Sequence, residues 1–325
     1  MEFILLIVGL VLIIKSADVL IDSTSKIARK YGVSTFIIGI TVVAFGTSAP
    51  EFIVGLISAI NGTNQLSLGN IVGSSYANTA LIIGICAMLF PLIVKDTVVK
   101  REIPMLIFTQ AVFAIMVITD SVLSRIEGVI LLFGFTGFIL YIIKNAKKSM
   151  PVSIDPEGDI DTDGDGNMVT EIKESSMPKL WIFSAISLIG LFVGGKLSVD
   201  SSTKIAYTFG LSETVIGITV VAIATTLPEM ITSIMAIRKK EPDIVVGNCV
   251  GSNLFNILLV LGLSSTIKPI SVSGDMTFDL LLMVLLTLVV FIVTLIKKCI
   301  SRPIGIALVA SYTAYLSLKI IVLVM

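Results

Sequence analysis

The stretch Ala44-Phe45-Gly46-Thr47-Ser48-Ala49-Pro50-Glu51 decides the interpretation of this sequence. It lies within a long apolar segment that contains no lysine or arginine. The proline removes a backbone donor and leaves the carbonyl four residues back, at Gly46, without its helical partner. Helical spacing places the hydroxyls of Thr47 and Ser48 on the same face as Glu51. A carboxylate at the centre of a bilayer costs on the order of 3 kcal/mol unless it is neutralised, so this face predicts a functional polar site.

A second copy of the stretch, Ala222-Ile223-Ala224-Thr225-Thr226-Leu227-Pro228-Glu229, follows 178 residues later (225 − 47 = 178). Around it, Gly32–Asn78 aligns without a gap to Gly210–Asn256, with 19 identities in 47 positions. Chance similarity between apolar helices would not keep polar residues in register. They include the pairs Ser34/Ser212, Thr47/Thr225, Glu51/Glu229, Asn70/Asn248, Ser74/Ser252 and Asn78/Asn256. The chain is therefore an internal duplication. A purely structural hydrogen bond explains one membrane glutamate more readily than two repeat-related ones.

The composition places the whole chain in a membrane. Of its 325 residues, 55% are hydrophobic and 14% charged, with a mean hydropathy of +1.03, values too apolar for a soluble domain. Spans of about twenty apolar residues cross a bilayer as helices. Ten are predicted, at about 2–21, 35–60, 67–90, 103–119, 127–144, 179–199, 213–237, 244–267, 277–296 and 303–323. The N-terminus lacks the features of a signal peptide, so the first span is expected to be retained.

These spans predict an all-α integral membrane fold of two five-helix repeats, at residues 1–144 and 179–325, joined by an acidic linker at 145–178. Because five is odd, the second repeat enters the membrane from the opposite face and is inverted. Seventeen lysines and arginines fall in connections on one face and three on the other. Since basic loops stay in the cytoplasm, both termini are expected outside, in a multi-pass protein of the cell membrane.

The repeated polar residues predict an all-oxygen cation site. Ser74 and Asn78, like Ser252 and Asn256, are spaced four apart. The nearby glycines Gly69, Gly73, Gly247 and Gly251 fit close helix packing, which leaves the polar pairs unexplained. Together with two carboxylates and the hydroxyls they supply the oxygens that hard cations such as Ca²⁺ take. With no histidine in the chain, imidazole ligands are excluded, and the three cysteines, Cys86, Cys249 and Cys299, match neither a zinc site nor a disulfide framework.

These motifs resemble the two alpha repeats of the calcium/cation antiporter superfamily, and specifically the sodium/calcium exchangers. The resemblance implies antiport of Ca²⁺ and Na⁺ without a cofactor, and no enzymatic activity. It implies that the ions are bound by Glu51, Glu229, Thr47, Ser48, Thr225, Thr226, Ser74, Asn78, Ser252 and Asn256, with help from carbonyls near Ala44 and Ala222. It also implies that the first and sixth helices slide over a fixed core. The expected partners are the ions and the lipid bilayer, not nucleic acid. The sequence does not fix the oligomeric state, and a monomer is compatible with it.

Three departures from the family pattern bear on the ion. Ala224 and Thr226 stand where the second motif usually has glycine and serine, and Asn256 stands where many relatives carry aspartate. The proton/calcium branch typically has asparagine at the position of Thr47, so H⁺/Ca²⁺ exchange through the same glutamates is the alternative. An intramembrane hydrolase is not favoured, because no nucleophile with a base is found.

The acidic linker contains Asp159-x-Asp161-x-Asp163-Gly164, which resembles the start of a calcium loop. The twelfth position, where an EF-hand has glutamate, is Thr170. A solvated linker is therefore preferred to a regulatory calcium site, and a calcium sensor is the remaining alternative to a transporter.

Overall fold

A computed structural model describes residues 1–61, 64–146, 176–209, 222–272 and 276–324. Helices occupy nearly all of this part. Seven of the described helices are long and apolar enough to cross a membrane, and a bent pair makes an eighth candidate. The all-α expectation holds apart from four strands of two residues each. The described helices overlap all ten predicted spans, although only 222–238 of the seventh is described; the count of ten remains a prediction.

The first half runs through five consecutive groups of elements. Their bounds are α1 Glu2–Tyr31; α2 Thr35–Ile38, η1 Gly39–Val43, α3 Ala44–Thr47 and α4 Ala49–Asn61; α5 Asn64–Tyr76, η2 Ala77–Ile82 and α6 Ile83–Leu89; η3 Val98–Glu102 and α7 Ile103–Asp120; and α8 Arg125–Ala146. The η elements are π-helical turns. Such turns interrupt helices most often at functional sites.

The second half repeats this order. Its elements are α9 Met177–Thr208; α11 Ala222–Arg238; α12 Pro242–Phe255, η5 Asn256–Leu261 and α13 Gly262–Ile267; α14 Thr277–Lys297; and α15 Arg302–Val324. The repeated residues Ser212 and Ile216–Val221, and the calcium-loop residues of the linker, lie outside the described part. From α11 onward the described elements follow one another in a similar order to those of the first half.

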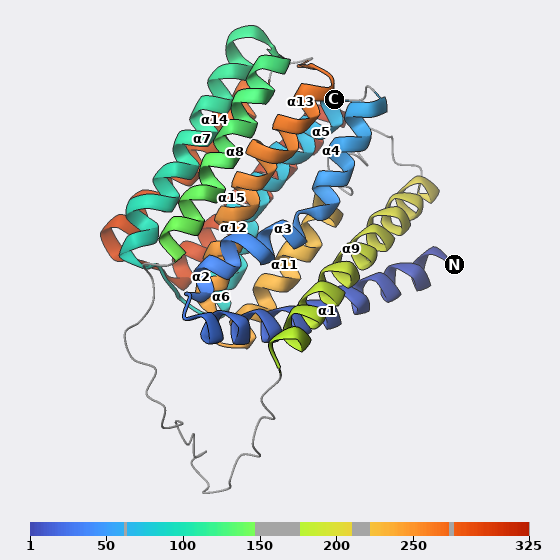
Figure 1. The fold of residues 1–325 in the computed structure, drawn as a ribbon. Coiled ribbons are helices and arrows are strands. Elements are labelled where there is room, and N and C mark those ends of the chain that lie inside the picture. Colours follow the sequence, from blue (N-terminus) through green and yellow to red (C-terminus); the bar gives the residue numbers. More distant parts are fainter. Residues whose placement is uncertain (62–63, 147–175, 210–221, 273–275, 325) are drawn as a thin grey trace, which may run out of the picture.

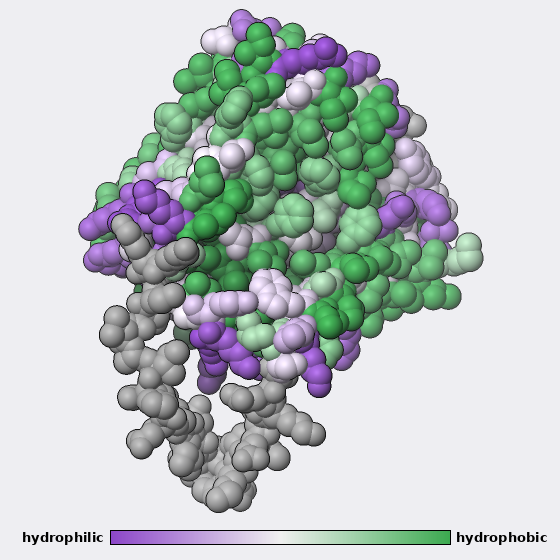
Figure 2. Space-filling view, viewed as in Figure 1, coloured by the Kyte–Doolittle hydropathy of each residue, from purple (hydrophilic) through white to green (hydrophobic). Residues whose placement is uncertain are grey.

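Short antiparallel strand pairs mark the two ends of the helix bundle. Leu92–Ile93 (β1) pairs with Cys299–Ile300 (β4), and Val122–Leu123 (β2) pairs with Ile270–Ser271 (β3). The first pair joins two connections that the sequence placed on the basic face, and the second joins two connections of the opposite face. This pairing agrees with the predicted alternation of spans. Figure 2 shows a broad hydrophobic surface between hydrophilic residues at the upper and lower ends of the molecule.

Ion pairs cross-link the connections of the basic face. Arg29 pairs with Glu241 at 3.0 Å, and Lys95 with Asp243 at 2.5 Å. A third pair, Lys298 with Asp96 at 2.9 Å, joins the connections around β1 and β4, and its hydrogen bond lowers the pKa of the Asp96 carboxyl. Exposed pairs of this kind contribute little stability each.

Two long helices differ in direction from the rest of the bundle. The long helices α1 and α9 lie side by side and are tilted relative to the others (Figure 1). Both extend past their predicted ends, to Tyr31 and Thr208, because the helix continues through charged residues beyond the apolar segment.

The broken second span packs tightly against α12. A Cβ atom added at Gly247 would lie 2.6 Å from the carbonyl oxygen of Phe36, and one at Gly251 would lie 2.6 Å from that of Ile40. Only glycine permits such an approach of two backbones. The packing role predicted for Gly247 and Gly251 is thus observed, and it brings Thr47 and Ser48 beside the second repeat. For Gly69 the prediction is wrong, because a Cβ atom added there would have no described neighbour within 4 Å.

Candidate ion-binding site

Both glutamates lie in the protein interior, on helices from different repeats. Glu51 is in the first turn of α4 and Glu229 is in α11, and each is 1% exposed. The other predicted side-chain ligands, Thr47, Ser48, Thr225, Thr226, Ser74, Asn78, Ser252 and Asn256, are all buried as well. No lysine or arginine is buried among the residues whose burial is described. The carboxylates therefore lack a basic partner in the described interior.

Hydroxyl groups connect the two carboxylates across the repeat boundary. Ser48 Oγ donates to Glu229 Oε1 at 3.1 Å, and Ser74 Oγ lies 3.5 Å from Glu51 Oε1. Thr226 Oγ1 lies 3.5 Å from Ser74 Oγ, and the Thr225 hydroxyl lies close to the Glu51 carboxylate. Each glutamate is thus contacted by a hydroxyl from the other half, which joins both halves into one site.

Two reciprocal hydrogen bonds frame this cluster. Thr47 Oγ1 donates to Asn248 Oδ1 at 3.1 Å, and Thr225 Oγ1 donates to Asn70 Oδ1 at 3.2 Å. These are the same bond seen from each repeat, because Thr47 matches Thr225 and Asn70 matches Asn248. The site prediction omitted Asn70 and Asn248. Their identity between the repeats was the signal that could have included them.

Several buried oxygens at the site have no hydrogen-bond donor in the described part of the chain. They are Glu51 Oε2, Glu229 Oε2, Asn78 Oδ1, Ser252 Oγ and Asn256 Oδ1. Buried polar atoms are otherwise almost always partnered, so each such group requires an explanation. The five oxygens come from five elements, and two of them are carboxylate oxygens. Oxygens of these kinds are the ligands that a hard cation takes.

Local backbone geometry sets where these side chains lie. The second span, predicted as one helix over 35–60, is broken at Ser48 between α3 and α4, and the two parts of the span are bent by 47°. Asn78 lies in the π-helical turn η2, and Asn256 begins the corresponding turn η5. By contrast, α11 is a single helix from Ala222 with Pro228 inside it. The two halves therefore differ in how they accommodate the proline.

For the two backbone carbonyls of the predicted site, the structure gives hydrogen bonds for Ala44 but only the position in the helix for Ala222. The Ala44 carbonyl accepts from Ser48 N at 3.0 Å, and Thr47 Oγ1 lies 3.4 Å from it. Ala222 is the first residue of α11. No group of three or more Cys, Asp or Glu residues that could hold a metal is found where the structure is described. The candidate site therefore combines two carboxylates with neutral oxygens.

The family model for sodium/calcium exchanger protein matches residues 1–144 and 179–321. The chain belongs to the sodium/calcium exchanger protein family. It is a membrane transporter and not an enzyme. The matched ranges leave out residues 145–178.

Relatives of the exchanger family cover most of the chain. It is 38% identical over 266 residues to the inner membrane protein YrbG of Escherichia coli, covering 82% of this chain and 79% of that protein. It is 32% identical to the sodium/calcium exchanger MaX1 of Methanosarcina acetivorans, covering 97% of each chain. A solved structure of the sodium-calcium exchanger NCX_Mj, soaked with Na⁺ and Sr²⁺, is similar with a TM-score of 0.82 at 28% identity, covering 97% of each chain. The exchanger fold therefore extends over the whole chain.

Proposed function

We propose that this exchanger carries Ca²⁺ in one direction and Na⁺ in the other, at a single site around Glu51 and Glu229. The observation that carries the proposal is the set of five buried oxygens without a donor. Two of these oxygens belong to the carboxylates of Glu51 and Glu229, in an interior whose described residues include no buried lysine or arginine. One divalent ion or a small set of monovalent ions offsets two negative charges. The remaining hydroxyl and amide oxygens then complete the coordination.

Charge also explains why transport is an exchange. Two ionised carboxylates without a cation are costly in an interior of low dielectric constant. The empty site therefore crosses between its two orientations poorly, and each passage requires a bound cation. An ion that leaves on one side is replaced by a counter-ion for the return, which is antiport.

Ion gradients in sealed vesicles test the choice of counter-ion. Purified protein is reconstituted in proteoliposomes loaded with Na⁺, and uptake of ⁴⁵Ca²⁺ is followed after dilution into Na⁺-free buffer. The proposal expects uptake that depends on the outward Na⁺ gradient and is abolished when Na⁺ is equal on both sides. Uptake driven by a pH gradient alone, and indifferent to Na⁺, would replace it with the H⁺/Ca²⁺ alternative.

We further propose that both termini face the outside of the cell membrane and that one chain is sufficient for transport. The ion pairs and the β1–β4 strands join the connections that carry most of the basic residues. All residues of the candidate site come from a single chain. A membrane-impermeant thiol reagent applied to intact cells tests the orientation: it should label Lys204→Cys and leave Lys297→Cys unlabelled.

A further inference from the structure

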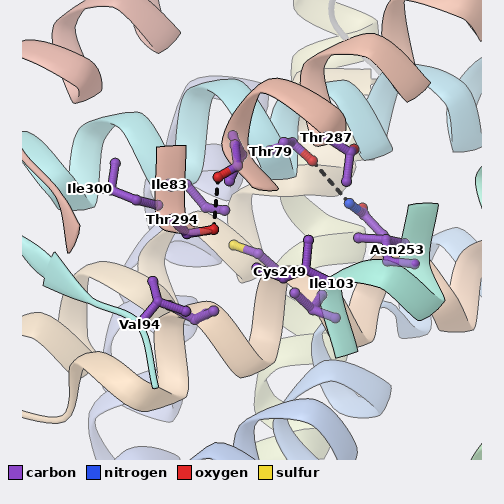
Figure 3. Close-up of a pocket in the computed structure, with 13 residues that line it drawn as sticks. Thr79, Ile83, Val94, Ile103, Cys249, Asn253, Thr287, Thr294 and Ile300 are labelled. Atoms are coloured by element: carbon purple, nitrogen blue, oxygen red, sulfur yellow. Dashed lines mark hydrogen bonds between the residues drawn. The ribbon is translucent and has the colours of Figure 1, made fainter. Parts of the chain in front are cut away.

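The side-chain amide of Asn78 is held by a directed chain of hydrogen bonds that lies behind the ion site. Asn78 Nδ2 donates to Asn253 Oδ1 at 3.0 Å. Asn253 Nδ2 in turn donates to Thr79 Oγ1 at 3.1 Å, and Thr79 Oγ1 donates to the carbonyl oxygen of Ser75 at 3.0 Å. All four residues are buried. Figure 3 shows Asn253 and Thr79 on the wall of a small cavity, joined by a dashed line.

The direction of this chain is fixed at the backbone. The Ser75 carbonyl can only accept, and the Thr79 hydroxyl has a single hydrogen, which it uses there. Thr79 must then accept from Asn253, so the Asn253 amide turns its nitrogen to Thr79 and its oxygen to Asn78. The Asn78 amide consequently turns its nitrogen toward Asn253. Its oxygen, Oδ1, is left without a partner in the described interior.

The orientation of an asparagine amide decides whether it can serve a cation, because one end is an acceptor and the other carries two donors. Turning Asn78 around would present N–H groups to the cation. It would also require Thr79 to give up its bond to the Ser75 carbonyl. The hydrogen-bond chain therefore selects the oxygen of Asn78 for the ion site.

The described part of the second repeat has no equivalent chain of hydrogen bonds. The positions that correspond to Asn253 and Thr79 are Ser75 and Ile257. Ser75 Oγ and both amide atoms of Asn256 have no hydrogen-bond partner among the described residues. Nothing in that part of the structure fixes which end of the Asn256 amide faces the site.

We infer that Asn253 and Thr79 are positioning residues, which orient the Asn78 amide so that its oxygen faces the ion. The bond of Thr79 to the Ser75 carbonyl fixes the direction of the chain. The Asn256 amide has no such support among the described residues. This inference rests on the proposed function, because it assigns an orientation to one of the proposed ligands. It makes the two amides of the repeated motif unequal. Asn78 is preset for a cation, and Asn256 has to be ordered by the ion that it binds.

Thr79→Val tests the inference because it removes the hydroxyl and nearly conserves the volume. The apparent KM for Ca²⁺ should rise about three- to tenfold, the range that corresponds to the loss of one hydrogen bond. The maximal rate should change by less than roughly twofold, because folding and turnover remain. Thr79→Ser, which keeps the hydroxyl, should restore the wild-type KM. The readout is Na⁺-driven ⁴⁵Ca²⁺ uptake in proteoliposomes.

Thr287→Val is the matched control. Thr287 lines the same cavity, is 2% exposed, and donates its hydroxyl to the Met283 carbonyl at 3.1 Å. The Thr287→Val variant makes the same change of side chain outside the hydrogen-bond chain and should leave the KM for Ca²⁺ unchanged. If Thr79→Val does not fold, Asn253→Ser takes its place. That variant introduces the residue of the matching position and should raise the KM similarly.

A second background separates orientation from packing. In Asn78→Asp both ends of the side chain are acceptor oxygens, so its orientation no longer matters to a cation. One of these oxygens faces Asn253 Oδ1, and the two acceptors repel each other. Adding Thr79→Val frees Asn253 to turn, so in this background it should leave the KM unchanged or lower it. An equal rise of KM in both backgrounds, or equal behaviour of Thr79→Val and Thr287→Val, would overturn the inference. Wild-type protein without Na⁺-driven Ca²⁺ uptake would instead refute the proposed function.

Discussion

The two repeats supply the same polar side chains to the candidate ion site but support them differently. In the first half the span is broken at Ser48, and the Asn78 amide is held by Asn253 and Thr79. In the second half α11 runs through Pro228 as one helix, and the side-chain amide of Asn256 has no hydrogen-bond partner in the described structure. A duplicated sequence has thus kept the candidate ion ligands while the residues next to them in space have diverged.

The comparison indicates which features of the site follow from ion binding and which do not. The reciprocal bonds Thr47–Asn248 and Thr225–Asn70 are retained in both copies. The glutamates are also equivalent. The supports of the two amides differ, and so do the residues at Gly46 and Ala224. These positions are where ion preference can differ between the two halves. The following predictions test each level of this symmetry.

The largest effect is expected from the glutamates. Glu51→Gln and Glu229→Gln should each reduce Na⁺-driven Ca²⁺ uptake by about a hundredfold or more, because the cation loses a desolvated charge partner. The two losses should be similar, since the residues are equivalent. Glu127→Gln is the matched control: Glu127 accepts from the Ser124 backbone N–H at 2.7 Å, and glutamine can keep this role. Normal uptake by either the Glu51 or the Glu229 variant would contradict the claim that both glutamates bind the ion.

The next effect distinguishes the two amides. Asn256→Asp should be tolerated, with equal or higher affinity for Ca²⁺, because the amide it replaces has no bond to lose in the described interior. Asn78→Asp should lower the affinity by about tenfold relative to Asn256→Asp, because its carboxylate faces the Asn253 oxygen. Apparent KM values for Ca²⁺ in proteoliposomes provide the measurement. Equal behaviour of the two variants would show that the amides are equivalent after all.

A smaller and symmetric effect is expected from the reciprocal bonds. Thr47→Val and Thr225→Val each remove one cross-repeat hydroxyl bond, and each should raise the KM for Ca²⁺ by about three- to tenfold. The symmetry predicts values within roughly threefold of one another. Thr287→Val again serves as the control for a buried hydroxyl outside the site. A large effect in one variant alone would contradict the equivalence of these bonds.

The smallest effect concerns Gly46 and Ala224, which differ between the two repeated stretches. A Cβ atom added at Gly46 would lie 1.9 Å from Leu188 Cδ2 of α9, so Gly46→Ala requires Leu188 to move. It should cost about 1 kcal/mol of stability, and Leu188→Ala should suppress the clash. Ala224→Gly should cost a similar amount through helix propensity. Thermal unfolding in detergent measures both, and a stabilising effect of Gly46→Ala would contradict the close contact with α9.

Much of this structure could be predicted from the sequence because the repeat preserves register. The constant spacing located the paired glutamates and their hydroxyls, and apolar length located the helices. The ends of α1 and α9 could not be predicted from apolar length, because these helices continue through charged residues. The strand pairs β1–β4 and β2–β3 were too short to leave a pattern.

The support of the site could not be predicted for a different reason. Asn253 and Thr79 stand opposite Ser75 and Ile257 in the alignment of the repeats, so a search for identities passes over them. Their role depends on a three-dimensional contact between the halves. The orientation of the Asn78 amide depends on a hydrogen bond to a backbone carbonyl, which sequence does not reveal. Mismatched polar positions beside a matched ligand are the signal to look for in other duplicated transporters.

Equilibrium binding of ⁴⁵Ca²⁺ to the purified protein, with Na⁺ as competitor, tests the central claim most directly. The account predicts saturable binding of one Ca²⁺ per chain, displaced by Na⁺, and lost when Glu51 and Glu229 are both replaced by glutamine. Glu127→Gln should bind like wild type. Undiminished Ca²⁺ binding by the double variant would contradict the claim that these two glutamates form the ion site.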